Sequence, residues 1–127
     1  MTIAAHLKTA CDRALDELMQ EVKGIKAVVV ATEDGFEVAA QVENTAQIAR
    51  LSAMASSLAA LGAMAGEESQ LGVCHSLLME AADGYITIVQ VRRADVSLIV
   101  SVVTGRDAVI GQVLYFSKKA AATLQAA

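Results

Sequence analysis

Cys74 and His75 are neighbours in this sequence, and both side chains commonly bind soft metal ions. Because neighbouring residues on a β-strand point to opposite faces of a sheet, these two side chains cannot bind one ion together. A structural zinc site also needs four ligands. The second histidine, His6, is expected at a solvated surface position near the amino end. The sequence therefore predicts no metal site.

The carboxylates and glycines do not form a catalytic pattern either. Glu67 and Glu68 are expected at the solvated end of a helix, and Glu80 is expected on a strand, where it can be partly buried. A phosphate-binding loop needs a glycine-rich turn followed by lysine, whereas Gly62 and Gly66 lie inside a helical pattern with no lysine after them. We therefore predict a protein that is not an enzyme and that uses no cofactor.

The composition indicates one compact domain, residues 1–127, with an aliphatic core. The chain is 55% hydrophobic and only 3% aromatic, which favours a core of aliphatic side chains and some apolar surface shared with a partner. Cys11 and Cys74 lie in apolar-periodic segments, so both are expected to be buried free thiols. The net charge is −4 and the basic residues are scattered, which argues against nucleic-acid binding.

Nothing in the sequence predicts a targeting or membrane segment. The first eight residues have no basic region before a long apolar run, so no signal peptide is expected. The uncharged run Leu51–Gly66 is shorter than the roughly 20 residues of a spanning helix, and Ser52, Ser56 and Ser57 dilute it. A cytoplasmic protein without membrane insertion is expected.

The elements that position these residues follow from periodicity. Apolar residues at steps of three and four predict a first helix that begins near Ile3 and ends before Gly24. Strands are predicted at Ile25–Ala31, as a central strand, and at Phe36–Val42, as an alternating strand near an edge; Asp34-Gly35 predicts the hairpin between them.

The second half of the chain predicts another helix, three strands and a last helix. A helix capped by Asn44 or Thr45 should run to about Ser69. Strands are predicted at Val73–Ala81, Tyr85–Val91 and Val96–Val103, with Asp83-Gly84 as the turn after the first of these, and the final helix follows Thr104–Asp107. Strands joined by loops this short should be antiparallel neighbours.

The middle helix has more apolar surface than one sheet face can bury. One stripe contains Ile48, Leu51, Ala55, Leu58, Gly62 and Ala65, and a second contains Met54, Ser57, Leu61 and Met64. Small residues such as Ala60, Gly62 and Gly66 let two helix backbones approach closely, so a second helix is expected there. The strand Val73–Ala81 lacks the lysines, proline or bulges that usually protect an edge, so it is expected to pair with its twin.

The succession of motifs resembles the roadblock / dynein light-chain family over nearly the whole chain. The motifs are Ala27-Val28-Val29-Val30-Ala31, Asp34-Gly35, the Ala/Ser/Leu-rich segment Leu51–Leu58, Leu77–Glu80, Asp83-Gly84-Tyr85-Ile86 and Gly111–Tyr115. The resemblance implies an α+β fold of order αββαβββα. In it, a five-stranded antiparallel sheet has the long middle helix on one face and the terminal helices on the other.

The resemblance also implies a homodimer and a class of partner. The middle helices should pack together and the third strands should pair edge to edge. The predicted interface residues are Met54, Ser57, Leu58, Leu61 and Met64 on the helix and Cys74, Ser76, Leu78 and Glu80 on the strand. Family members, including the bacterial gliding-polarity regulator, regulate or scaffold Ras-like small GTPases, so a non-catalytic regulator or scaffold of this kind is expected.

Arginines are the residues most able to contact such a GTPase, because an inserted guanidinium can stabilise transition-state charge. The candidates are Arg50, Arg92, Arg93 and Arg106, of which Arg92 and Arg93 lie in a turn and can project. The alternative interpretation is that all four are ordinary surface residues. Two rival functions also remain open: a small-molecule sensory domain, and a structural dimerisation clamp that does not contact a GTPase.

Overall fold

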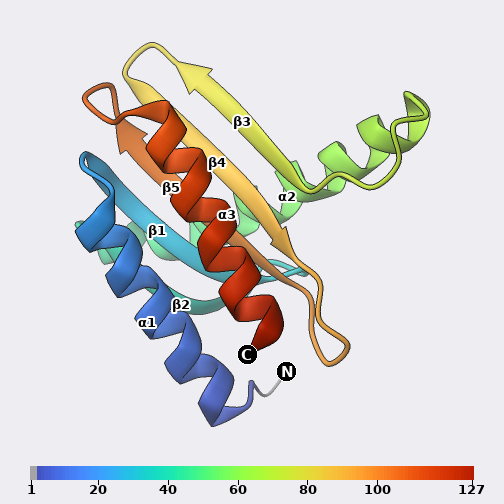
Figure 1. Cartoon of the computed structure of the whole chain (residues 1–127), viewed down its shortest axis with the longest axis horizontal. Helices are drawn as coiled ribbons and strands as arrows, with labels where there is room; N and C mark the ends of the chain where they lie inside the picture. The colour runs from blue at the N-terminus through green and yellow to red at the C-terminus, as the bar shows by residue number, and fades with distance from the viewer. Residues whose placement is uncertain (1–2) are drawn as a thin grey trace.

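The computed structural model describes residues 3–127 and confirms the predicted order of elements and the antiparallel five-stranded sheet (Figure 1). The elements are α1 (Ala5–Glu21), β1 (Ile25–Thr32), β2 (Glu37–Val42), a 3-10 turn (Thr45–Gln47), α2 (Ile48–Glu68), β3 (Ser76–Ala81), β4 (Gly84–Val91), β5 (Leu98–Gly105) and α3 (Ile110–Ala126).

The strands lie in the order β2-β1-β5-β4-β3, so β2 and β3 form the two edges. Three of the four pairings join strands that are consecutive in the sequence, as short hairpin loops require. The fourth joins β1 to β5, with Val28 opposite Val102, and brings the two halves of the chain into one sheet. The central position predicted for β1 is confirmed, because Ala27–Thr32 are all buried.

The helices cover the two faces of the sheet unequally. α1 and α3 lie side by side on one face and α2 lies on the other (Figure 1). The larger core lies between the sheet and the α1–α3 pair and includes Leu7, Leu15, Leu18, Val28, Val30, Val100, Val102, Val113 and Leu124. Under α2 the buried cluster consists of Ala55, Ala59, Ile88 and Ile99. This small cluster leaves much of the surface of α2 uncovered.

Glycines fix three places in the chain path. Gly24 and Gly35 have φ of 87° and 94°, which confirms the helix end and the hairpin turn expected there. Gly84 serves a different purpose from the one predicted: Ala82 and Asp83 form the turn, and Gly84 is the first residue of β4. A Cβ atom at Gly84 would lie 1.9 Å from the carbonyl oxygen of Thr104, so close approach to β5 requires glycine.

The third strand begins at Ser76, three residues later than predicted. The chain turns at Gln70 and Gly72, whose φ values are 58° and 88°. Residues Val73–His75 then pass close to α2 before β3 starts. The last strand is also shifted and occupies Leu98–Gly105, because its first residue, Leu98, lies opposite Thr32, where β1 ends.

Two burial predictions were wrong. Val38 and Ala39 of β2 are both buried, and both belong to the larger core on the α1–α3 side of the sheet. The register of β2 against β1 shifts at this place, between Val30 and Ala31, so the strand does not alternate. Cys11 is buried as expected, and burial raises the pKa of its thiol from 9.0 to about 11. Cys74, in contrast, is only half-buried, because it precedes β3 at the sheet edge.

Candidate functional site

The exposed face of α2 is a stripe of apolar side chains with no partner in the described chain. Met54, Leu61 and Met64 are 50%, 60% and 62% exposed, and Ser57 between them is also exposed. Steps of three, four and three residues place these four side chains on one face, as in the seam of a helix pair. Leu58, which was predicted with them, instead packs against the cluster between α2 and the sheet.

The carboxyl-terminal part of α2 extends past the edge of the sheet. Figure 1 shows α2 crossing behind the strands and continuing beyond β3 into the turn that follows. Leu71 and Val73, which follow the helix, are 83% and 62% exposed. The apolar stripe therefore continues over a part of the molecule that has no sheet beneath it.

Gly62 and Gly66 contact their own chain and not a second helix. A Cβ atom on Gly62 would lie 3.0 Å from both the Sγ of Cys74 and a methyl group of Leu77, and one on Gly66 would lie 2.5 Å from the carbonyl oxygen of Gly72. The small residues of this helix face therefore let the segment before β3 pack closely. The expectation that these two glycines accommodate another helix was wrong.

The edge strand β3 is also exposed and apolar. Leu78 and Met79 are 46% and 43% exposed, and Glu80 is exposed. The side chain of Glu80 is thus not partly buried in the described chain. Cys74 lies two residues before the strand, and its carbonyl oxygen accepts a hydrogen bond from the guanidinium of Arg92 at 3.1 Å. The edge that is free for backbone pairing therefore starts at Ser76.

The length of α2 bears on the membrane prediction. Counted with the preceding 3-10 turn, Thr45–Glu68 is a 24-residue helix that contains an 18-residue window with a mean hydropathy of 1.4, long and apolar enough to span a membrane by length and composition alone. The sequence-based length argument was therefore too strict. The core helix of a soluble protein passes the same test, and Ala55 and Ala59 of this helix pack on the sheet.

Arg93 holds the end of a helix. Its Nε and Nη2 atoms donate to the carboxylate of Asp95 at 2.9 and 3.1 Å, and its Nη1 donates to the carbonyl oxygens of Leu124 and Ala127 at 2.6 and 2.7 Å. The hydrogen bond from Arg93 lowers the pKa of Asp95. A cation at the carboxyl end of α3 satisfies carbonyl groups that have no partner within the helix. With its side chain only 9% exposed, Arg93 is not free to reach a partner.

Replacing Arg93 by alanine is expected to lower the free energy of unfolding by about 1–3 kcal/mol, because it removes charge-assisted hydrogen bonds to the end of α3. Urea unfolding followed by circular dichroism measures this loss. Arg50→Ala, an exposed control on α2, should change stability by less than about 0.5 kcal/mol. Equal stability of the Arg93 variant and the wild type would contradict this assignment.

The other candidate arginines lie apart from one another. Arg92 is exposed beside β3 and also donates to the side-chain oxygen of Gln90 at 3.0 Å. Arg106 donates to the carbonyl oxygen of Ala82 at 2.9 Å and so supports the β3–β4 turn. Arg50 is exposed near the start of α2. The structure does not bring these side chains together into one basic site.

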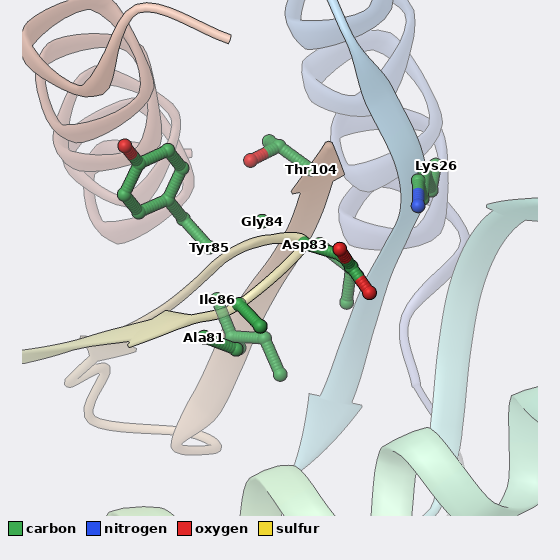
Figure 2. Close-up of a pocket in the computed structure, with 9 residues that line it drawn as sticks. Lys26, Ala81, Asp83, Gly84, Tyr85, Ile86 and Thr104 are labelled. Atoms are coloured by element: carbon green, nitrogen blue, oxygen red, sulfur yellow. The ribbon is translucent and has the colours of Figure 1, made fainter. Parts of the chain in front are cut away.

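A shallow hollow of about 330 Å³ lies where the β3–β4 turn meets the ends of β1 and β5. Figure 2 shows Tyr85 and Thr104 on one side of it and Lys26 and Asp83 on the other. Thr104 is 2% exposed, and no hydrogen-bond partner is described for its hydroxyl oxygen. Within residues 3–127, no three metal-binding side chains gather here or elsewhere.

The comparisons with known proteins assign this chain to a family. Residues 12–100, more than half of the chain, match the Roadblock/LC7 domain model. The chain belongs to the Roadblock/LC7 family. The resemblance inferred from the order of its motifs is thereby confirmed. No curated protein matches the chain.

Solved structures show the same fold at low sequence identity. MglB from Myxococcus xanthus superposes with a TM-score of 0.84 at 14% identity, covering 99% of this chain and 92% of that one. The gliding protein MglB from Thermus thermophilus gives 0.84 at 13% identity, covering 99% and 93%. A Roadblock/LC7 domain from Streptomyces avermitilis gives 0.77 at 20% identity, covering 91% and 94%. This Roadblock/LC7 domain thus keeps the fold of the bacterial members throughout.

Proposed function

We propose that this domain is a non-catalytic homodimer that regulates or scaffolds a Ras-like small GTPase. The observation that supports the dimer most strongly is the joint exposure of the α2 stripe and the β3 edge. Met54, Leu61 and Met64 are each at least half exposed, and they continue past a sheet edge that carries the exposed Leu78. Exposed apolar patches of this kind mark protein interfaces.

A two-fold axis at the β3 edge uses both surfaces at once. Antiparallel pairing of two β3 strands extends the sheet and leaves both α2 helices on the same face. Because α2 extends beyond β3, each helix then reaches toward the other protomer (Figure 1). The apolar stripes meet at that face, whereas α1 and α3 remain available on the opposite face.

The choice of a GTPase as partner rests on family membership, because members of this family act as regulators or scaffolds of Ras-like GTPases. Arg92 and Arg50, which are both exposed, stay as candidate contacts, whereas Arg93 is withdrawn because α3 already occupies its guanidinium. Such a domain can regulate a GTPase without a catalytic group of its own, provided that the domain positions residues of the GTPase.

A capture experiment with the immobilised protein tests this proposal. Partners are captured from its native cell lysate in two parallel samples, one with GDP and one with a non-hydrolysable GTP analogue. Recovery of a small GTPase mainly with the GTP analogue is the expected result and makes hydrolysis assays the next step. Recovery of the GTPase in equal amounts with both nucleotides would favour a scaffold whose binding does not depend on which nucleotide the GTPase carries. Absence of any GTPase would leave a structural clamp and contradict the proposed partner.

A further inference from the structure

We infer that two copies of β3 pair with Leu78 on the two-fold axis, and that Lys118 of each protomer forms an ion pair with Glu80 of the other. This inference rests on the homodimer proposed above and adds to it the register of the strands and the residues that select that register.

The backbone groups available at the edge follow from the pairing of β3 with β4. The carbonyl oxygen of His75 accepts the N–H of Gln90 at 3.0 Å, which marks a hydrogen-bonded pair. Such pairs recur at every second residue of an antiparallel ladder, so Leu77 and Met79 also direct their backbone groups to β4. The backbone groups of the alternate residues therefore point outward from the sheet; these residues are Ser76, Leu78 and Glu80.

The side chains of these same three residues lie on the α3 face of the sheet. The hydroxyl groups of Thr87 and Ser117 lie 3.0 Å apart, which places Thr87 of β4 under α3. Leu78 lies directly opposite Thr87 and therefore projects to the same face. Ile88 belongs to the cluster under α2, so Leu77, which lies opposite Ile88, projects to the other face.

Charge and hydrogen bonding distinguish the possible registers. An axis at Glu80 places two carboxylates directly opposite each other, which is destabilising. An axis at Met79 places Glu80 opposite Leu78, with no hydrogen-bond donor. An axis at Leu77 places Glu80 opposite Cys74, whose carbonyl oxygen is already bound by Arg92. An axis at Leu78 places Glu80 opposite Ser76, whose hydroxyl group can donate to the carboxylate.

Lys118 supplies the opposite charge at the place where this register brings Glu80 of the second copy. Its side chain lines the same surface hollow as His75 and Ser76, so it reaches the β3 edge from α3. Among residues 3–127, neither Lys118 nor Glu80 has an ion-pair partner within 4.0 Å, whereas the neighbouring Lys119 binds Glu17 of α1 at 2.9 Å. In this register Lys118 of one protomer lies close to Glu80 of the other, and the two-fold axis generates a second, equivalent pair.

Charge reversal and mixing test this pairing. Glu80→Lys and Lys118→Glu should each weaken the homodimer about tenfold, because each replaces two attractive contacts by two repulsive ones. Mixed in equal amounts, the two variants should form a heterodimer of near wild-type affinity, because both inter-protomer contacts are then attractive. Contacts within one protomer stay repulsive in that mixture, so only pairing between protomers gives this recovery. Lys23→Glu, an exposed control with the same change of charge as Lys118→Glu, should dimerise like the wild type.

Disulfide crosslinking of variants with a single introduced cysteine determines the register of the two β3 strands directly. In a Cys74→Ser background, Leu78→Cys should link to its twin on oxidation, because Cα atoms of an opposed hydrogen-bonded pair lie about 5.5 Å apart, within reach of a disulfide. Preferential linking of Leu77→Cys or Met79→Cys, or a charge-variant mixture that binds no better than its components, would overturn the inference while leaving the dimer intact. A wild-type chain that stays monomeric would reject the proposed dimer itself.

Discussion

Replacing Leu61 by aspartate is expected to raise the dissociation constant of the homodimer by about a hundredfold or more. Leu61 lies in the middle of the exposed α2 stripe, between Ser57 and Met64, and is 60% exposed in the single chain. A large apolar residue at the centre of an interface commonly contributes several kcal/mol to binding, and the two-fold axis introduces the carboxylate twice. Sedimentation equilibrium over a range of protein concentrations measures the change.

Tyr115 offers a matched control for this experiment. It is 63% exposed and lies on α3, which covers the face of the sheet opposite the α2 stripe. Tyr115→Asp should therefore leave the dissociation constant within about twofold of the wild-type value, because rim or remote surface changes have little effect on binding. Weakening of the dimer by the Tyr115 change and not by the Leu61 change would place the interface on the α1–α3 face.

Replacing Gly84 by alanine is expected to lower the free energy of unfolding by about 3 kcal/mol or more. The added Cβ atom would lie 1.9 Å from the carbonyl oxygen of Thr104, which belongs to the backbone of β5 and cannot move aside as a flexible side chain can. The two strands must separate, and this loosens the pairing of Gly84 with Gly105 at the end of the sheet. Chemical denaturation of the purified variant gives the free energy directly.

Gly111 provides the contrasting control. It lies in the first turn of α3, and a Cβ atom there would have no neighbouring atom within 4 Å. Gly111→Ala should raise the free energy of unfolding by up to about 1 kcal/mol, because alanine is the better helix former. A Gly84 variant as stable as the wild type would contradict the close approach of β4 and β5.

The parts of the fold that depend on local pattern could be predicted from the sequence. The spacing of apolar residues by three and four positions predicted the helices, and the two hairpin turns predicted which strands are antiparallel neighbours. The left-handed φ at Gly24 and Gly35 follows from local backbone geometry, and both positions were predicted. The apolar stripe containing Met54 and Leu61 was found in the same way, and the structure leaves it exposed.

The parts that depend on distant contacts could not be predicted. The pairing of β1 with β5 joins residues about seventy positions apart, with Val28 opposite Val102, and no periodicity encodes it. The close approach of Gly62 to Leu77 also arises only when α2 lies across the sheet. Arg93 was taken for a projecting residue because its binding to the end of α3 is a tertiary contact.

The most direct test of the proposed homodimer is the mass of the wild-type protein at micromolar concentration, measured by sedimentation equilibrium. One chain has a mass of 13.2 kDa, and the two-fold arrangement predicts about 26 kDa. The expected result is this dimer mass for the wild type and for Tyr115→Asp, and the mass of one chain for Leu61→Asp. A single species of 13.2 kDa at the same concentration would show that the α2 stripe and the β3 edge do not hold two copies together.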